Sequence, residues 1–235
     1  MSRFAHVGCF RGCPESRSAG DLAGGDGPLL AGGERLRVRS AGWLACGSIG
    51  LVTVIYVVQH GDKVRLPGDP GLTELGKDQA AATARWLGGA GLQALFSSPL
   101  RRARETAAAI AAATGLPVQL DDRLRERLNW DGTQTFDAFA ADWDRSVRDR
   151  DFTPGDGESS RSAGDRMRAF LTGLCGRPGP VAAVSHGGVT TDLLRNLLGD
   201  EALPPGLLAG GIRPCAVTTF DDLRVVAIAS TAHFR

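Results

Sequence analysis

The sequence predicts an α/β fold, in which helices cover a mostly parallel sheet. Short apolar segments that fit buried strands alternate with longer segments of helical periodicity between residues 52 and 229. This alternation is typical of parallel sheets with helical crossovers. Two of the expected strands end in a His-Gly pair, at His60 and at His186. Because the carboxyl ends of parallel strands meet at one edge of a sheet, both histidines are expected in one cleft.

The bulk composition fits an ordinary globular domain. Of the 235 residues, 43% are hydrophobic and 23% are charged, and the net charge is +1. These values indicate no general attraction to nucleic acid or to a membrane, so we expect neither as a partner. Five scattered cysteines without disulfide spacing favour a reducing, cytoplasmic location. Cys9 and Cys13 lie close to His6 but lack a fourth ligand, so we expect no metal site.

Residues 1–50 differ from the rest of the chain. Gly-rich pieces and scattered arginines follow no sustained period of 2 or 3.6, and such a segment buries too little apolar surface to offset its ordering entropy. We expect a disordered extension, with translation beginning near Leu51 or Val52, and a folded domain over residues 51–235. The uncharged run 41–58 has 18 residues, enough for a membrane span, but its β-branched second half favours a strand.

The first strand is expected from residue 52 to about residue 58, directly before His60. A loop rich in proline and glycine follows at 62–71. Thr73 then fits the N-cap of a helix that runs to about residue 87, where a Gly-Gly pair ends it. The expected core contacts of this segment are Leu72, Leu75, Trp86 and Leu87.

The next helix is expected to begin at a Ser-Pro pair. Residues 92–97 fit a short buried strand, after which Ser98 fits an N-cap and Pro99 the first helical position. This helix should continue to Ala113 and end at Thr114-Gly115. Another short strand is expected at 116–120.

An aromatic pattern predicts a helix in the second half of the chain. Phe136, Phe139, Ala140, Trp143 and Val147 recur at helical spacing, which we interpret as a helix packed on the core. The remaining expected elements are a helix at 159–175, a strand at 181–185, a helix from 186 to 198, and a C-terminal hairpin of strands 215–220 and 223–229.

The two strand ends favour a site for phosphate. His60 and His186 should share the cleft, and the glycine after each leaves room for a ligand. The N-termini of the following helices favour an anion. Arg102, in the first turn of the helix after Pro99, reaches the same side.

Six segments of the chain resemble one family. They are VIYVVQHGDK, LTELGKDQA, SSPLRRARETA, RLRERLNWDG, GDGESSRSAGDR and VSHGGVTTDLLRNLLG. In this order, over about residues 52–235, they resemble the histidine phosphatase superfamily, the phosphoglycerate mutase-like enzymes. The resemblance implies a three-layer α/β/α sandwich and a histidine that accepts a phosphoryl group to form phosphohistidine.

The resemblance also implies roles for single residues. His60 matches the nucleophile, and His186 and Arg102 match phosphate-binding residues. Glu126 matches the proton donor, which protonates the leaving oxygen and then activates water. Glu158, in a Gly-Glu-Ser segment, is a secondary candidate near the substrate. No metal or other cofactor is implied.

One position departs from the family pattern. The strand normally ends in Arg-His-Gly, whereas Gln59 stands at the arginine position, and a glutamine donates a hydrogen bond without adding charge. Lys63 or Arg65 could supply the missing charge to a phosphate site that includes Gln59 and Gly61.

Two functions therefore stay open. The first is hydrolysis of a small phosphomonoester through a phosphohistidine on His60. The alternative is a degenerate domain that binds a phosphorylated ligand with weak or no turnover. Hydrolysis is favoured over a mutase reaction because the segment between Glu126 and Val181 is short and leaves little room for a lid. The sequence indicates neither the substrate nor the oligomeric state.

Overall fold

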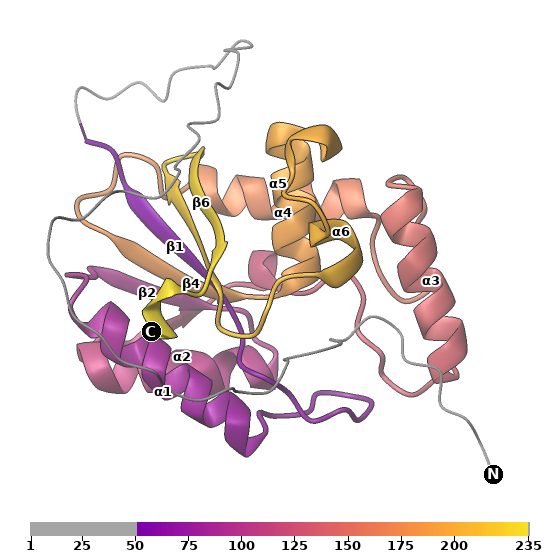
Figure 1. Cartoon of the computed structure of the whole chain (residues 1–235), viewed down its shortest axis with the longest axis horizontal. Coiled ribbons are helices and arrows are strands. Elements are labelled where there is room, and N and C mark those ends of the chain that lie inside the picture. Colours follow the sequence, from indigo (N-terminus) through magenta and orange to yellow (C-terminus); the bar gives the residue numbers. More distant parts are fainter. Residues whose placement is uncertain (1–50, 235) are drawn as a thin grey trace, which may run out of the picture.

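A six-stranded sheet lies at the centre of the computed structural model, which describes residues 51–234 (Figure 1). The expected disordered extension and the cysteines at 9 and 13 lie outside the described residues. The strands, in spatial order, are β3 (Val118–Leu120), β2 (Ala94–Ser97), β4 (Val181–Ser185), β1 (Val54–Gln59), β5 (Val217–Asp221) and β6 (Arg224–Ser230).

The sheet is mostly parallel, as the sequence predicts. The pairs β3–β2, β2–β4 and β4–β1 are parallel, and the C-terminal hairpin adds two antiparallel strands. Gln59 pairs with Ser185 at the ends of β1 and β4, and the N–H of His60 donates to the Ser185 carbonyl at 3.1 Å. His60 and His186 therefore leave neighbouring strands at the same edge.

Helices cover both faces of the sheet and give the three-layer sandwich (Figure 1). The helices are α1 (Glu74–Gly88), α2 (Arg101–Thr114), α3 (Phe136–Arg148), α4 (Ser160–Thr172), α5 (Gly187–Leu198) and α6 (Leu207–Gly210), with 3-10 turns at Asp122–Leu124, Asp200–Ala202 and Ala232–Phe234. One face of the sheet packs against α1 and α2 through a core that includes Leu87, Leu95 and Ile110, and the other packs against α4 and α5 through Met167, Phe170 and Leu193.

The expected start of α1 is confirmed, but two of its expected core contacts are wrong. The Thr73 hydroxyl accepts the N–H of Gly76 at 3.0 Å, as an N-cap does. Leu72 and Leu87 are buried, whereas Leu75 is 59% exposed and Trp86 is 40% exposed. The helical period allows several faces, and here the buried stripe runs through the small alanines instead.

The expected start of α2 is wrong by two residues. The N–H of Ser98 donates to the Val184 carbonyl at 2.9 Å, which holds residue 98 against β4 directly after β2, and the helix begins only at Arg101. Its first-turn N–H groups are capped from a distant loop, because the Asp69 carboxylate accepts the N–H of Arg101 at 2.8 Å. Beyond its last residue, Gly115 adopts the left-handed conformation, with φ 72°, as expected for a helix end.

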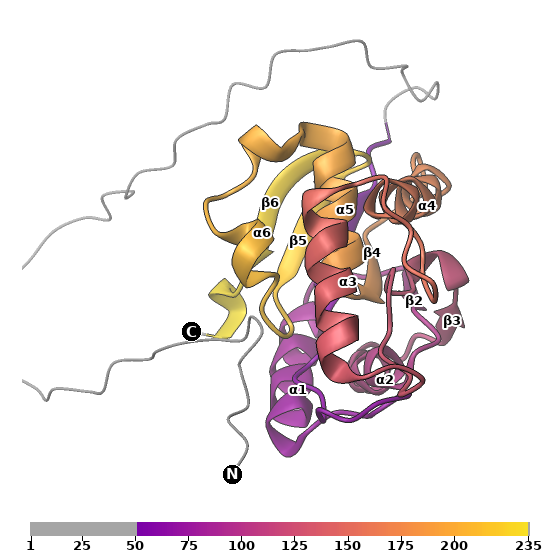
Figure 2. The same ribbon diagram turned by 90° about the vertical axis from the view of Figure 1, so that its right-hand side faces the viewer.

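Helix α3 forms where expected, but its aromatic residues do not join the core. Its buried residues are Ala140 and Ser146, while Phe136 is 43% exposed. Figures 1 and 2 show α3 outside α5, beyond the two helical layers. The pattern predicted the helix correctly and the packing of its aromatic face incorrectly.

The remaining elements agree closely with the expectations. Helix α4 begins after the Ser159 N-cap and ends at Thr172, three residues early, because a turn follows at 173–176. The second half of the uncharged run 41–58 forms β1. Within residues 51–234, no helix has the length and apolarity that a membrane span requires.

Candidate active site

His60 follows the end of β1 and has one ring nitrogen with an available lone pair. Its side chain is 8% exposed, and its Nδ1–H donates to the carbonyl of Gly61 at 2.7 Å. The ring proton is thereby held on Nδ1, so Nε2 carries the lone pair, which accepts from Nε of Arg102 at 3.2 Å. Burial first, and then the charge of Arg102, lowers the pKa of His60 to about 3. The imidazole is therefore neutral at pH 7, as a nucleophile must be.

The backbone after His60 is fixed by a close contact with α1. A Cβ on Gly61 would lie 2.5 Å from the Gly76 carbonyl oxygen, and a Cβ on Gly76 would lie 2.0 Å from the Asp62 carbonyl oxygen. The N–H of Gly61 also donates to the hydroxyl of Thr106 at 3.0 Å. Glycine at 61 is therefore required for packing, independently of any ligand.

His186 lies beside His60, and its Nε2 atom contacts a serine hydroxyl. The two ring centroids are 5.2 Å apart. The Ser98 hydroxyl accepts the N–H of Leu100 at 3.3 Å and lies 2.8 Å from Nε2 of His186, to which it can donate its own hydrogen. In that tautomer the ring proton of His186 is on Nδ1. Burial and the nearby Arg102 hold the pKa of His186 well below its usual range, so this ring is neutral as well.

Two buried donors meet near the nucleophile without a partner of their own. Neither Nδ1 of His186 nor Nη1 of Arg102 has a hydrogen-bond partner among residues 51–234. Arg102 is only 3% exposed, and its closest carboxylate oxygen, from Asp69, is 3.9 Å from Nη1. Buried donors without partners are costly, and donors of this kind suit the oxygens of a phosphoryl group.

Gln59 occupies the place next to the nucleophile without adding charge. Its amide nitrogen lies 3.3 Å from Nε2 of His60, and its buried Oε1 has no hydrogen-bond partner in the described part of the chain. Lys63 is close enough for its charge to contribute to the lowered pKa of His60. The structure thus brings a second cation toward the site, from the loop that follows β1.

Glu126 is held against the first turn of α5. One carboxylate oxygen accepts the N–H groups of Arg127 at 2.9 Å and Val189 at 2.8 Å, and the other accepts that of Gly188 at 2.9 Å. Gly188 leaves the room for this contact, because a Cβ there would lie 2.4 Å from Glu126 Oε1. The helix N-terminus therefore orients the carboxylate.

Glu158 forms its side-chain contacts with residues of α4. It forms an ion pair with Arg166 and accepts a hydrogen bond from Ser162 at 3.3 Å. Arg166 in turn donates to the backbone carbonyls of Arg123 and Arg125, at 2.6 and 3.0 Å. Through Arg166, Glu158 thus stabilises the backbone segment that precedes Glu126.

Sequence reasoning missed several residues that shape this site. Ser98 contacts Nε2 of His186, Asp69 caps α2 beside Arg102, and Arg127 stacks its guanidinium 3.9 Å above the ring of Trp143. Ser98 carried a signal, since a polar residue directly after a buried strand reaches the ligand edge of a sheet. Asp69 and Arg127 carried none, because both depend on contacts between distant segments.

The combined geometry suits nucleophilic displacement at phosphorus. It offers a neutral imidazole, buried donors for anionic oxygens and a carboxylate at a helix N-terminus. Residues 55–221 match the sequence model of the histidine phosphatase superfamily (branch 1).

Known relatives include both phosphatases and a mutase. The chain is 35% identical over 145 residues to glucosyl-3-phosphoglycerate phosphatase of Mycolicibacterium vanbaalenii, covering 56% of this chain and 64% of that protein. It therefore spans less than two thirds of that relative's length. It is 31% identical over 192 residues to a probable phosphoglycerate mutase of Erwinia tasmaniensis, covering 75% of this chain and 88% of that protein.

The fold is shared with a solved relative. The structure of mycobacterial glucosyl-3-phosphoglycerate phosphatase with inorganic phosphate superimposes with a TM-score of 0.61 at 30% identity. The alignment covers 77% of this chain and 98% of the other.

Proposed function

The chain belongs to the histidine phosphatase superfamily, and on that premise we propose that it hydrolyses a small phosphomonoester through a phosphohistidine on His60. The observation that carries this proposal is the state of His60: a buried neutral ring whose Nδ1–H is bound to the Gly61 carbonyl, with Nε2 as acceptor. This arrangement supports Nε2 as the atom that attacks phosphorus.

In the first step the Nε2–P bond forms as the ester P–O bond breaks. Arg102 Nη1 and His186 Nδ1, the two buried donors without partners, hold the non-bridging oxygens. Arg102 also has to release Nε2 of His60, to which it donates at 3.2 Å, and the phosphoryl oxygens offer its guanidinium a better acceptor. The Gln59 amide adds a neutral donor beside the same atom.

Glu126 is the proposed acid and base. The leaving oxygen takes a proton, and in the second step a water loses a proton as its oxygen attacks phosphorus and the N–P bond breaks, releasing inorganic phosphate. The first step requires a protonated Glu126 that turns one oxygen away from the α5 amides, which it meets at 2.8 to 2.9 Å. The ionised carboxylate held by those amides is already in the form that accepts the proton of water.

The proposed substrate class is a small phosphorylated metabolite. Relatives that are named phosphatases, including glucosyl-3-phosphoglycerate phosphatase, support this class and favour hydrolysis over phosphoryl transfer between positions.

A binding role without rapid turnover is the second candidate. It is favoured by Gln59, which contributes no charge where the family pattern has a cation, and by the three backbone contacts that hold Glu126. In that case phosphate affinity persists while release of the ester oxygen is slow.

The test is turnover of an aryl phosphate by wild type and by His60→Ala, with Glu74→Ala as the control. Glu74 is exposed in the first turn of α1, so its loss should leave turnover unchanged. We expect His60→Ala to lose at least about 10³-fold in kcat, because the covalent route is removed. An acid-labile phosphorylated protein should accumulate with wild type only. Turnover that does not depend on His60 contradicts the proposal, and phosphate binding without any turnover favours the second candidate.

A further inference from the structure

Four aromatic rings form a continuous row along α3 and the segment before it. We call Trp130, Phe136, Phe139 and Trp143 the aromatic row. Successive ring centroids are 5.2, 6.1 and 6.2 Å apart. Phe136 is exposed and the other three are half-buried. A row of rings that lies outside the core requires another explanation than core packing.

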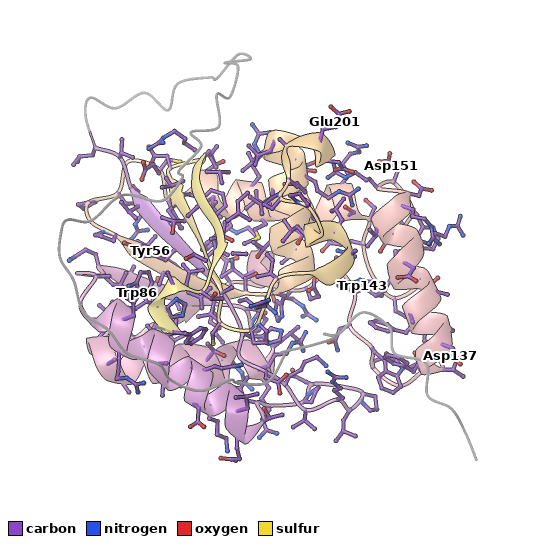
Figure 3. All side chains as sticks on the ribbon, viewed as in Figure 1. Tyr56, Trp86, Asp137, Trp143, Asp151 and Glu201 are labelled. Carbon is purple, nitrogen blue, oxygen red and sulfur yellow. The ribbon has the colours of Figure 1, made fainter. Side chains whose placement is uncertain are left out.

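The inner end of the aromatic row reaches the catalytic carboxylate. The ring edge of Trp143 would lie 2.7 Å from a Cβ on Gly188, the residue whose N–H binds Glu126. Figure 3 places Trp143 on the side of α3 that faces α5. The row therefore begins at the first turn of α5, beside the proposed acid and base.

Buried contacts fix this inner end in place. The Arg127 guanidinium stacks 3.9 Å above the Trp143 ring, donates to Asp192 at 2.9 Å and donates to Ser146 at 3.3 Å. Arg127 and Asp192 are both buried, and Arg127 therefore links Trp143 and Ser146 of α3 to Asp192 of α5. Trp143 is thus held in one orientation before any ligand arrives.

The outer end reaches the loop that follows the nucleophile. The Gly68 N–H donates to the Trp130 carbonyl at 2.9 Å, and Asn129 donates to the Gly68 carbonyl at 2.7 Å. The neighbouring Asp69 lies 3.9 Å from Arg102. The aromatic row therefore spans from this loop to α5, and both of its ends lie next to residues of the phosphate site.

We propose that the aromatic row is the subsite for the leaving group, and that it selects phosphomonoesters whose alcohol carries a flat ring with an apolar face. The inference rests on the proposed function. The Trp130 indole N–H is already bound to the Gln134 carbonyl at 2.9 Å, so this residue offers its ring and no donor. Rings fixed before binding lose little conformational entropy when a second ring stacks on them.

The test compares ligands that differ only in the ring. For turnover, phenyl phosphate and β-naphthyl phosphate are compared with glycerol 3-phosphate and a glucose phosphate, which separates an aromatic ring from a sugar ring. For binding, benzylphosphonate is compared with ethylphosphonate by calorimetry, which needs no turnover. The variants are Phe136→Ala, Phe139→Ala and Phe139→Leu, and Asp144→Ala is the matched control on the exposed side of α3.

We expect ring-bearing ligands to be preferred by about 10-fold in kcat/KM and in affinity, and each Phe→Ala change to reduce that preference by about fivefold. Phe139→Leu should lose nearly as much, since it keeps apolar area without a ring, and Asp144→Ala should lose nothing. Equal treatment of ring-bearing and ring-free ligands by wild type overturns the inference while leaving the phosphatase proposal intact. Phosphonate binding that depends on the ring, without any turnover, supports the aromatic subsite and overturns the phosphatase proposal. Absence of both phosphonate binding and turnover overturns the subsite inference and the phosphatase proposal together.

Discussion

Replacing Gln59 by arginine tests how far the neutral side chain limits the reaction. The Gln59 amide nitrogen lies 3.3 Å from Nε2 of His60, so it meets any phosphoryl group that approaches this atom. Gln59→Arg adds a charge and further donors at that point. We expect kcat for an aryl phosphate to rise by about 100-fold, because one donor to a developing oxyanion is worth about 10²–10³ in rate.

Gln59→Arg has two further effects, one on burial and one on the protonation of His60. The longer side chain has to leave a buried position where Oε1 is 3.4 Å from the place of a Cβ on Gly187, and an unpaired buried cation is costly until phosphate binds. The added positive charge also disfavours protonation of His60. That ring already has a pKa lowered to about 3, so it stays neutral at pH 7 and the nucleophile is not affected.

The assay is steady-state and single-turnover hydrolysis of one aryl phosphate. The control is Gln59→Met, which keeps the length of the side chain but removes its donor. It should lower kcat by about 10-fold, because a neutral hydrogen bond contributes about 0.5–1.5 kcal/mol and 10-fold corresponds to about 1.4 kcal/mol. A folded Gln59→Arg variant that binds phosphate and turns over no faster than wild type would refute the reasoning.

Lys63 decides how that refuting result is interpreted. If its charge already replaces the missing arginine, Lys63→Met alone should cost about 10²-fold in kcat, and Gln59→Arg should restore the loss. If Lys63 takes no part, Lys63→Met should change kcat by less than about twofold in either background. The double-mutant cycle therefore separates compensation from degeneration.

Two further predictions concern the same cleft. Gly188→Ala should lower kcat by at least about 10²-fold with little loss of phosphate affinity, because its Cβ would lie 2.4 Å from the Glu126 carboxylate and 2.7 Å from the Trp143 ring; phosphate binding that weakens in parallel would contradict this. The free energy of unfolding should fall by about 1.4 kcal/mol per pH unit below about pH 6.5 through His60 alone. The reason is that His60 binds a proton in the unfolded state below this pH, whereas in the folded state, where its pKa is about 3, it stays neutral. Urea unfolding between pH 7 and 4.5 should show a shallower slope for His60→Gln, and equal slopes would exclude this source.

Much of the fold could be predicted because local pattern and global architecture agree. The apolar strands at 54–59 and 181–185, each followed by His-Gly, predicted the sheet edge at which the histidines meet. The capping hydroxyl of Thr73 predicted the start of α1 for the same reason, since a cap acts within four residues.

The parts that could not be predicted depend on contacts between distant segments. Helical spacing predicted α3 but not that its rings would stack in a row outside the core, because periodicity indicates that a face exists and not what covers it. The start of α2 was shifted by a hydrogen bond to β4 and by a carboxylate 32 residues away. Glu126 was expected as an acid from the resemblance, but the hydrogen bonds that it accepts from the α5 amides depend on the three-dimensional fold.

The backbone contact between Gly61 and Gly76 has a consequence for how substitutions in this chain are tolerated. Gly76 lies inside a helix, where glycine is less favourable than alanine by about 1 kcal/mol, so a stability screen would mark it for replacement. A methyl group there would lie 2.0 Å from the Asp62 carbonyl oxygen and would push the segment that fixes the His60 tautomer. In a saturation mutagenesis experiment, position 76 should therefore be as intolerant as the nucleophile itself, although its residue has no side chain and takes no part in the chemistry.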